Sequence, residues 1–153
     1  MMSNYPLIFN SKPPENPEKP MHIVIICGSQ QTPSQSRKVG NWLAQRLTTT
    51  WTDEVSLFDL GERPVPLWNP GESKRAAPYV TTWGPIADAL QTADAVICIT
   101  PEWCGMATPA IKNFLLMCSA DLVGHKPALA VGVSASRGGT WPIAELRGSG
   151  FKN

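Results

Sequence analysis

The stretch Ala93–Asn113, "ADAVICITPEWCGMATPAIKN", decides the fold of this chain of 153 residues. Its first eight residues form an apolar run with β-branched side chains, which is typical of a strand covered on both faces. Thr108 can then cap a helix that has Pro109 in its first position and apolar residues at helical spacing after it. A buried strand that leads through a short loop into a helix indicates an α/β protein.

The rest of the chain repeats this alternation. Pro85 must either start or kink its helix, and the long loop 61–78 is typical of a lid or binding loop. Strand and helix in turn predict an open parallel sheet, in which all strands end at one edge and ligands bind there. Three further strands are predicted at 22–27, 54–60 and 128–134, and three further helices within 30–47, 80–90 and 141–147.

Composition excludes several classes of protein. The net charge of +1 gives no basic field for a nucleic-acid partner. No apolar stretch reaches the roughly 20 residues that span a bilayer, so no membrane association is expected. Residues 1–20 do not resemble a signal peptide, which favours the cytoplasm. They are predicted to form a Pro-rich tail, either a disordered leader or an arm on a partner subunit, before a domain at 21–153.

The four cysteines contain no pair with metal-ligand or redox spacing, so no metal site is predicted. Cys27 and Cys98 lie in strand-like runs and are expected to be small buried hydrophobes. Cys104 lies close to a helix N-terminus, where a thiolate is favoured. A Cys–His hydrolase is nevertheless disfavoured, because neither His22 nor His125 lies near it along the chain.

The first loop at the predicted binding edge is "GSQQTPSQS", residues 28–36. It combines hydroxyl groups and backbone amides with a helix N-terminus, which is a combination that binds phosphate. It matches neither a Walker A loop nor GxGxxG. The alternative is an ordinary helix cap at Ser34 or Ser36.

The second and third loops add features of a binding site. Trp103 and Met106 offer a flat, polarizable surface, and Gly105 permits close approach of a planar group, although Trp103 could instead pack under a neighbouring loop. Arg137 precedes two glycines in "SASRGGT", 134–140, which suits an anion, unless it is an ordinary surface arginine. Together the loops predict a site with a phosphate end and a flat-ring end.

From about His22 to Arg147 the sequence resembles the NADPH-dependent FMN reductase family, whose members have a flavodoxin-like fold. The family's Gly-Ser-x-Arg-x-x-Ser corresponds to "GSQQTPS", with Gln31 in place of Arg. Its Pro-Glu-Tyr-Asn-Gly, followed by Pro-Ala-Leu-Lys-Asn, corresponds to "PEWCG" and "PAIKN", with Trp103 for Tyr and Cys104 for Asn. Its Ser-x-x-x-Gly-Gly corresponds to "SASRGG".

The resemblance implies an enzyme that contains FMN and uses NADPH or NADH as co-substrate. Hydride would pass through the flavin to a quinone, azo or similar small acceptor. Because the cofactor carries this chemistry, no catalytic side chain is assigned; Arg137 is the candidate for stabilising negative charge. The expected cofactor-binding residues are Ser29, Gln31, Ser34, Gln35, Ser36, Pro101, Glu102, Trp103, Cys104, Gly105, Met106, Ser134, Arg137, Gly138 and Gly139.

The resemblance also implies the strand order 2-1-3-4-5 of a doubly wound sheet and a homodimer or homotetramer. Residues after Arg147 supply neither a fifth strand nor a last helix, so the fourth strand is expected at the edge. Two alternatives stay open. A non-catalytic flavodoxin-like module with weak or lost FMN binding is favoured by Gln31, Cys104 and the missing strand. A flavodoxin-like electron carrier is disfavoured by the net charge of +1.

Overall fold

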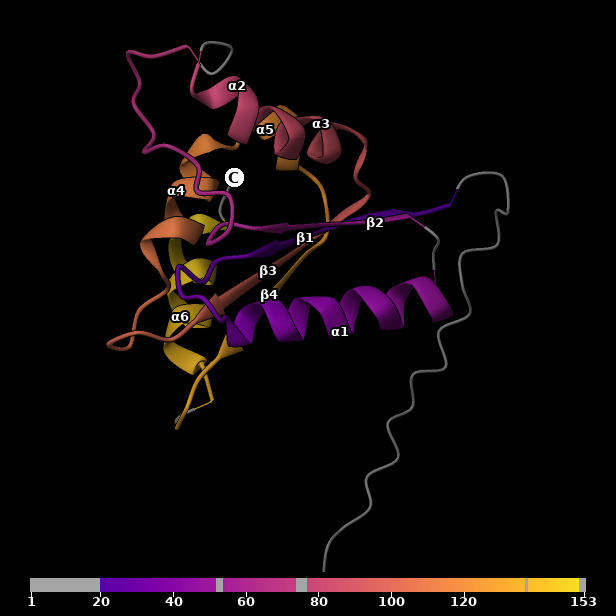
Figure 1. Ribbon diagram of the computed structural model, residues 1–153, viewed down its shortest axis with the longest axis vertical. Coiled ribbons are helices and arrows are strands. Elements are labelled where there is room, and N and C mark those ends of the chain that lie inside the picture. The colour runs from indigo at the N-terminus through magenta and orange to yellow at the C-terminus, as the bar shows by residue number, and fades with distance from the viewer. Residues whose placement is uncertain (1–19, 52–53, 74–76, 137, 152–153) are drawn as a thin grey trace, which may run out of the picture.

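The computed structural model describes residues 20–51, 54–73, 77–136 and 138–151 (Figure 1). Apart from Pro20, the predicted tail lies outside these residues, and so does Arg137. The strands are β1 His22–Cys27, β2 Glu54–Asp59, β3 Ala95–Pro101 and β4 Ala128–Val133. The helices are α1 Gln35–Thr50, α2 Tyr79–Thr82, α3 Gly84–Thr92, α4 Pro109–Met117, α5 Ala120–Val123 and α6 Thr140–Glu145, followed by the π-helical turn Leu146–Gly150.

The four strands form one parallel sheet in the order β2-β1-β3-β4, as predicted for a flavodoxin-like fold. Ile25 of β1 pairs with Leu57 of β2 and with Ile97 of β3, and Ile97 pairs with Leu129 of β4. All six residues of β1 are buried, because this central strand is covered on both faces. The parallel arrangement brings the ends of all four strands to one edge.

Helices cover the two faces of the sheet unequally. On one face, α1 packs Val39 and Leu43 against Ile23 and Ile25 of β1. On the other face larger side chains are buried, including the aromatic pair formed by Phe114 of α4 and Trp83, which lies between α2 and α3. In Figure 1, α1 runs along one side of the sheet, and α2 and α3 lie on the opposite side.

β4 is the outermost strand on its side, and no fifth strand is present among the described residues. Among the described residues, α1 is the only helix that packs on its face of the sheet. Leu129 of β4 is 52% exposed. Leu129 is therefore an apolar side chain largely in solvent. No helix in the described ranges has the length and apolar character that crossing a membrane requires.

The local signals at the helix starts are confirmed. The Ser34 side chain caps α1, the Thr108 side chain caps α4, and Pro109 occupies the first turn of α4. Pro85 starts α3 rather than kinking a longer helix, since α2 ends just before it. Between β2 and α2 the described residues contain no helix or strand, as expected for the long loop.

Candidate functional site

The loop after β1 combines buried hydroxyl groups with the N-terminus of a helix of 16 residues. Ser29 Oγ accepts the N–H of Gln31 at 3.2 Å, and Ser34 Oγ accepts the N–H of Arg37 at 3.0 Å. Ser29, Ser34 and Ser36 are buried, whereas Gln31 and Gln35 are exposed. The first turn of α1 contains no acidic residue, so its positive dipole end is open to an anion.

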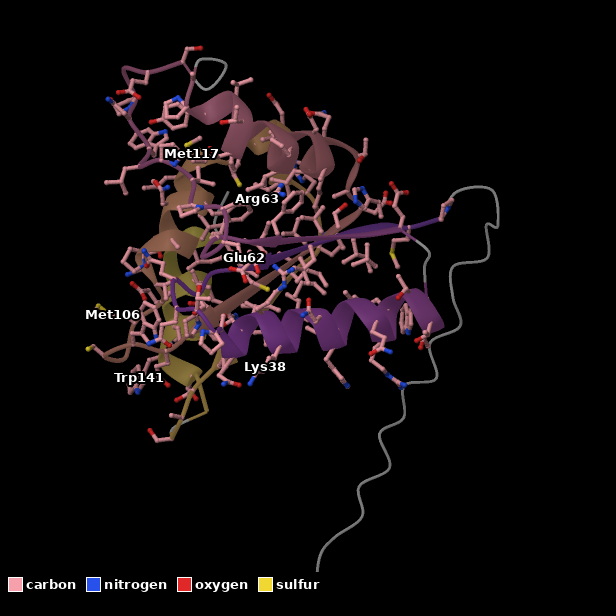
Figure 2. All side chains as sticks on the ribbon, viewed as in Figure 1. Lys38, Glu62, Arg63, Met106, Met117 and Trp141 are labelled. Atoms are coloured by element: carbon pink, nitrogen blue, oxygen red, sulfur yellow. The ribbon has the colours of Figure 1, made fainter. Side chains whose placement is uncertain are left out.

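The described basic residues near the first turn of α1 do not offer a free positive charge to this loop. Arg37 Nη1 lies 3.5 Å from Asp59 Oδ2 and 3.2 Å from Glu62 Oε2. Two carboxylates therefore neutralise the guanidinium. Lys38 points from α1 away from the sheet (Figure 2). Within the described part of this loop, an anion would thus meet amides, hydroxyls and the Gln31 side chain.

The loop after β3 contains a tight two-residue turn. The N–H of Trp103 donates to Met106 O at 3.2 Å, and the N–H of Met106 donates to Trp103 O at 2.9 Å. The central residues Cys104 and Gly105 have φ values of 51° and 73°, and positive values at both positions define a type I′ turn. Trp103 is partly buried, while the turn and Met106 project into solvent (Figure 2).

Hydrogen bonds, one buried and one partly exposed, tie this loop to the loop after β1 and to α6. Thr108 Oγ1 donates to Gly28 O at 2.5 Å, which joins the second loop to the first. Glu145 Oε2 accepts the N–H of Ala107 at 2.8 Å, and Glu145 Oε1 lies 2.5 Å from Lys112 Nζ. These contacts to the Lys112 side chain and the Ala107 amide hold the pKa of Glu145 below its usual range. The carboxylate form of Glu145 therefore anchors the loop.

The loop after β4 folds back onto its own strand. Glycine is required here because a β-carbon on Gly139 would stand 2.7 Å from the Cα of Gly132. Gly138 and Gly139 both have positive φ values, of 75° and 69°. Val133 O accepts the N–H of Glu102 at 2.8 Å, so the second and third loops are joined where β3 and β4 end.

Two buried polar atoms in these loops lack a hydrogen-bond partner among the described residues. They are Ser36 Oγ and Glu102 Oε2. Leaving such an atom unpaired costs about 1–3 kcal/mol, and a bound ligand can supply the missing partner. Ser36 is 1% exposed at the start of α1, where a phosphate group would find both a donor and the helix dipole. The residues present therefore fit the phosphate end of a flavin nucleotide.

The buried thiols do not contribute a nucleophile. Burial raises the pKa of Cys27 to about 12 and that of Cys98 to about 12. Both are packed in the sheet, as predicted. Cys104 is exposed, and its positive φ marks it as a turn residue.

The structure brings the predicted loops 28–36, 101–108 and 134–140 to one edge of the sheet, although Arg137 itself lies outside the described residues. Sequence reasoning assigned no role to Asn113 or Glu145. Asn113 belongs to a matched family motif and lies on the buried side of α4, which was the available signal. Glu145 had none, because its partners lie 33 and 38 residues away in the chain.

Comparison with known proteins agrees with this geometry. The sequence model of the family described as NADPH-dependent FMN reductase matches residues 21–151. An NADPH azoreductase of Bacillus sp. (strain OY1-2) is 29% identical over 130 residues, which are 84% of this chain and 68% of the relative. An FMN-dependent NADPH-azoreductase of Staphylococcus haemolyticus (strain JCSC1435) is 27% identical over 128 residues, 83% of this chain and 68% of the relative.

Solved structures show the same fold. The flavoenzyme NAD(P)H:acceptor oxidoreductase FerB from Paracoccus denitrificans superposes with a TM-score of 0.65 at 22% identity, over 85% of this chain and 70% of FerB. The apo form of the NADH:FMN oxidoreductase EMOB also has a TM-score of 0.65, at 20% identity, over 82% of this chain and 64% of EMOB.

Proposed function

Because this chain belongs to the NADPH-dependent FMN reductase family, we propose that its three loops bind FMN and that the protein reduces a quinone, azo or similar small acceptor. It is an NAD(P)H-dependent oxidoreductase. An azo compound as the acceptor is supported by the names of the two azoreductases that are similar to this chain. The observation that carries the binding site is the buried Ser36 hydroxyl at the N-terminus of α1, which has no hydrogen-bond partner among the described residues.

In this proposal the loop after β1 holds the phosphate of FMN. Ser29, Ser34 and Ser36 supply hydroxyl groups, and the exposed amides of Gln31 and Gln35 approach from solvent. The helix dipole stabilises the anion, in place of a paired cation. Because no arginine stands at position 31, phosphate binding rests on neutral donors.

The loop after β3 would hold the ring system. Pro101, Glu102 and Trp103 form its partly buried wall, and the turn at Cys104 and Gly105 brings backbone groups to the ring edge. Met106 covers the open side, while Ser134, Gly138 and Gly139 close the end next to β4. Arg137 remains our candidate for stabilising negative charge.

When bound in these loops, FMN would supply the hydride-transfer chemistry between the nicotinamide and the acceptor. The residues of this chain orient the ring, exclude water and stabilise charge. With a quinone acceptor, NADPH and one proton yield NADP⁺ and hydroquinone, so that two electrons leave the nicotinamide and reduce the two carbonyl groups. We further propose that the protein acts in the cytoplasm as a homodimer or homotetramer.

The test is a titration of the purified protein with FMN, with riboflavin in parallel, followed by visible absorption and flavin fluorescence. FMN should bind more tightly than riboflavin, because riboflavin lacks the phosphate. Ser36→Ala should weaken the binding of FMN and leave the binding of riboflavin unchanged. Ser119→Ala, at an exposed serine outside the loops, should change the affinity for neither ligand.

The holoprotein should then oxidise NADPH or NADH in the presence of 1,4-naphthoquinone or an azo dye. Protein that gains no flavin bands with excess FMN would contradict the proposal and favour a non-catalytic module. Flavin binding without oxidation of either nicotinamide would instead favour an electron carrier.

A further inference from the structure

One buried side chain fixes part of the long loop between β2 and α2. Asn113 Oδ1 accepts the N–H of Trp68 at 2.7 Å. The Asn113 amide donates to Pro66 O at 2.9 Å and to Val65 O at 3.3 Å. Asn113 is 7% exposed and lies on α4, so this helix holds three backbone groups of a loop more than 40 residues away.

A second buried side chain holds Leu67, the residue between Pro66 and Trp68. The Tyr79 hydroxyl, from α2, donates to Leu67 O at 2.7 Å, and Tyr79 is 3% exposed. Four consecutive residues, 65–68, are thus fixed through their backbones by two side chains from different helices. The Leu67 side chain is nevertheless 78% exposed. These hydrogen bonds give the backbone of residues 65–68 one fixed arrangement.

A cavity of about 240 Å³ lies between this loop and the first turn of α4. Its wall is formed mainly by aliphatic and proline side chains, and none of the described residues that line it is charged. Its polar side chains are those of Gln30 and Asn113, both amides. The residues that matter for its chemistry are Leu60, Pro64, Val65, Pro109, Gln30 and Asn113.

The volume and lining of the cavity define what it can take. A dry apolar cavity of about 150 Å³ holds benzene, whereas pockets for whole drug-sized ligands begin at about 300 Å³. A volume of about 240 Å³ therefore suits one ring or two fused rings, but not a whole flavin nucleotide. A charged group would find no partner charge among the lining residues, so a neutral ring is favoured.

The cavity borders the loops that we propose for FMN. Gln30 belongs to the loop after β1, Leu60 follows β2, and Pro109 follows the loop after β3. All three lie at the edge of the sheet where the strands end. A ring in the cavity would therefore lie next to the flavin loops.

We infer that this cavity binds the neutral planar ring of the electron acceptor, and that Asn113 and Tyr79 are positioning residues that hold its wall. This inference rests on the proposed function for the identity of the ring as an acceptor. The existence of the ring site itself does not depend on flavin binding, and the tests use this difference.

The direct test is nuclear magnetic resonance of the ¹⁵N-labelled, FMN-loaded protein titrated with 1-naphthol, a neutral two-ring compound. The side-chain amide signals of Asn113 should shift and saturate. Ala110→Leu fills the cavity and should abolish the shift. Ala120→Leu, the same change at an exposed position of α5, should not. An unmoved Asn113 signal in the unaltered protein, or the same titration after Ala110→Leu, would overturn the inference.

A second variant tests the cavity with little risk of unfolding the protein. Leu67 is largely exposed, so Leu67→Ala removes part of the wall with little risk to the core, and 1-naphthol affinity should fall several-fold. Naphthalene-1-sulfonate should bind at least about tenfold more weakly than 1-naphthol, because the cavity offers its charge no partner. Equal affinity for the two compounds would overturn the neutral-ring assignment.

Steady-state kinetics test whether the cavity binds the acceptor during turnover. Ala110→Leu should raise the KM for 1,4-naphthoquinone about tenfold while the Kd for FMN stays unchanged. The KM for ferricyanide, an anion that the cavity excludes, should not change. If the protein binds no FMN, the proposed function fails, yet the 1-naphthol titration of flavin-free protein still decides whether the ring site exists.

Asn113→Asp tests the positioning role with almost no change in shape. The carboxylate can still accept the N–H of Trp68, but it cannot donate to Val65 O or Pro66 O. The KM for 1,4-naphthoquinone should rise with FMN affinity unchanged. Protonation of the introduced carboxyl restores one hydrogen-bond donor, so the increase in KM should become smaller as the pH falls. A defect that does not vary with pH, or no defect, would overturn the positioning role.

Discussion

Gly132 and Gly139 lie in backbone contact, so close that a β-carbon on Gly132 would stand 2.5 Å from the carbonyl oxygen of Gly139. This contact returns the loop after β4 to the sheet edge. Gly139→Ala combines a clash with Gly132 and the strain of a positive φ, whereas Gly138→Ala has the same strain in open space. Gly138→Ala should cost about 1 kcal/mol of the free energy of unfolding. Gly139→Ala should cost about 1–3 kcal/mol more, by overpacking, and should weaken FMN binding. Urea unfolding and FMN titration measure both, and equal costs would contradict the contact.

The sheet and its helix starts could be predicted because their signals are local. The apolar run at 22–27 carries the strand signal by itself, and Thr108 stands next to the proline that starts α4. The family resemblance then predicted the strand order, which the parallel pairing of β1 with both β2 and β3 confirms. Because these features depend on neighbours in the chain, a single sequence contains them.

Contacts between distant segments could not be predicted in the same way. Nothing near Asn113 indicates that its side chain binds the loop at Trp68, 45 residues earlier. Nor does the sequence indicate that Arg37 is neutralised by Asp59 and Glu62. Such partners are chosen by the packing of helices on the sheet, which is a property of the whole fold.

The turn at Cys104 predicts a stabilising substitution. Cys104 has a φ of 51°, a left-handed conformation that is costly for most residues and tolerated best by glycine and asparagine. Cys104→Asn should raise the free energy of unfolding by about 0.5–1 kcal/mol. Cys104→Val should lower it, since a β-branched residue tolerates this conformation poorly. Urea unfolding checks both, and an Asn variant no more stable than the Val variant would refute the turn assignment.

The phosphate loop predicts a gain of affinity from one added cation. Gln31 stands where the family has Arg, and Arg37 is already neutralised. Gln31→Arg should tighten FMN binding about five- to tenfold through a charge-assisted hydrogen bond. The gain should shrink at high salt, which screens exposed charges. Riboflavin affinity should stay the same, and Gln45→Arg, at an exposed position farther along α1, should have no effect on either ligand. A similar gain for riboflavin would argue against a phosphate at this loop.

The carboxylate of Glu145 predicts a loss of stability at acid pH. The hydrogen bonds from Lys112 and Ala107 lower its pKa in the folded protein. A lowered folded pKa stabilises the fold above the unfolded pKa, which is about 4.3 for Glu, and this contribution is lost as the pH falls through the folded pKa. At neutral pH, Glu145→Gln should therefore lower the Tm by roughly a few degrees, and the gap in Tm between variant and unaltered protein should close as the pH falls below the unfolded pKa of about 4.3. Asp88→Asn, at an exposed carboxylate on α3, controls for the loss of a charge. Thermal unfolding across this pH range measures the gap, and a gap that stays constant with pH would show that the Glu145 carboxylate does not anchor the loop through its charge.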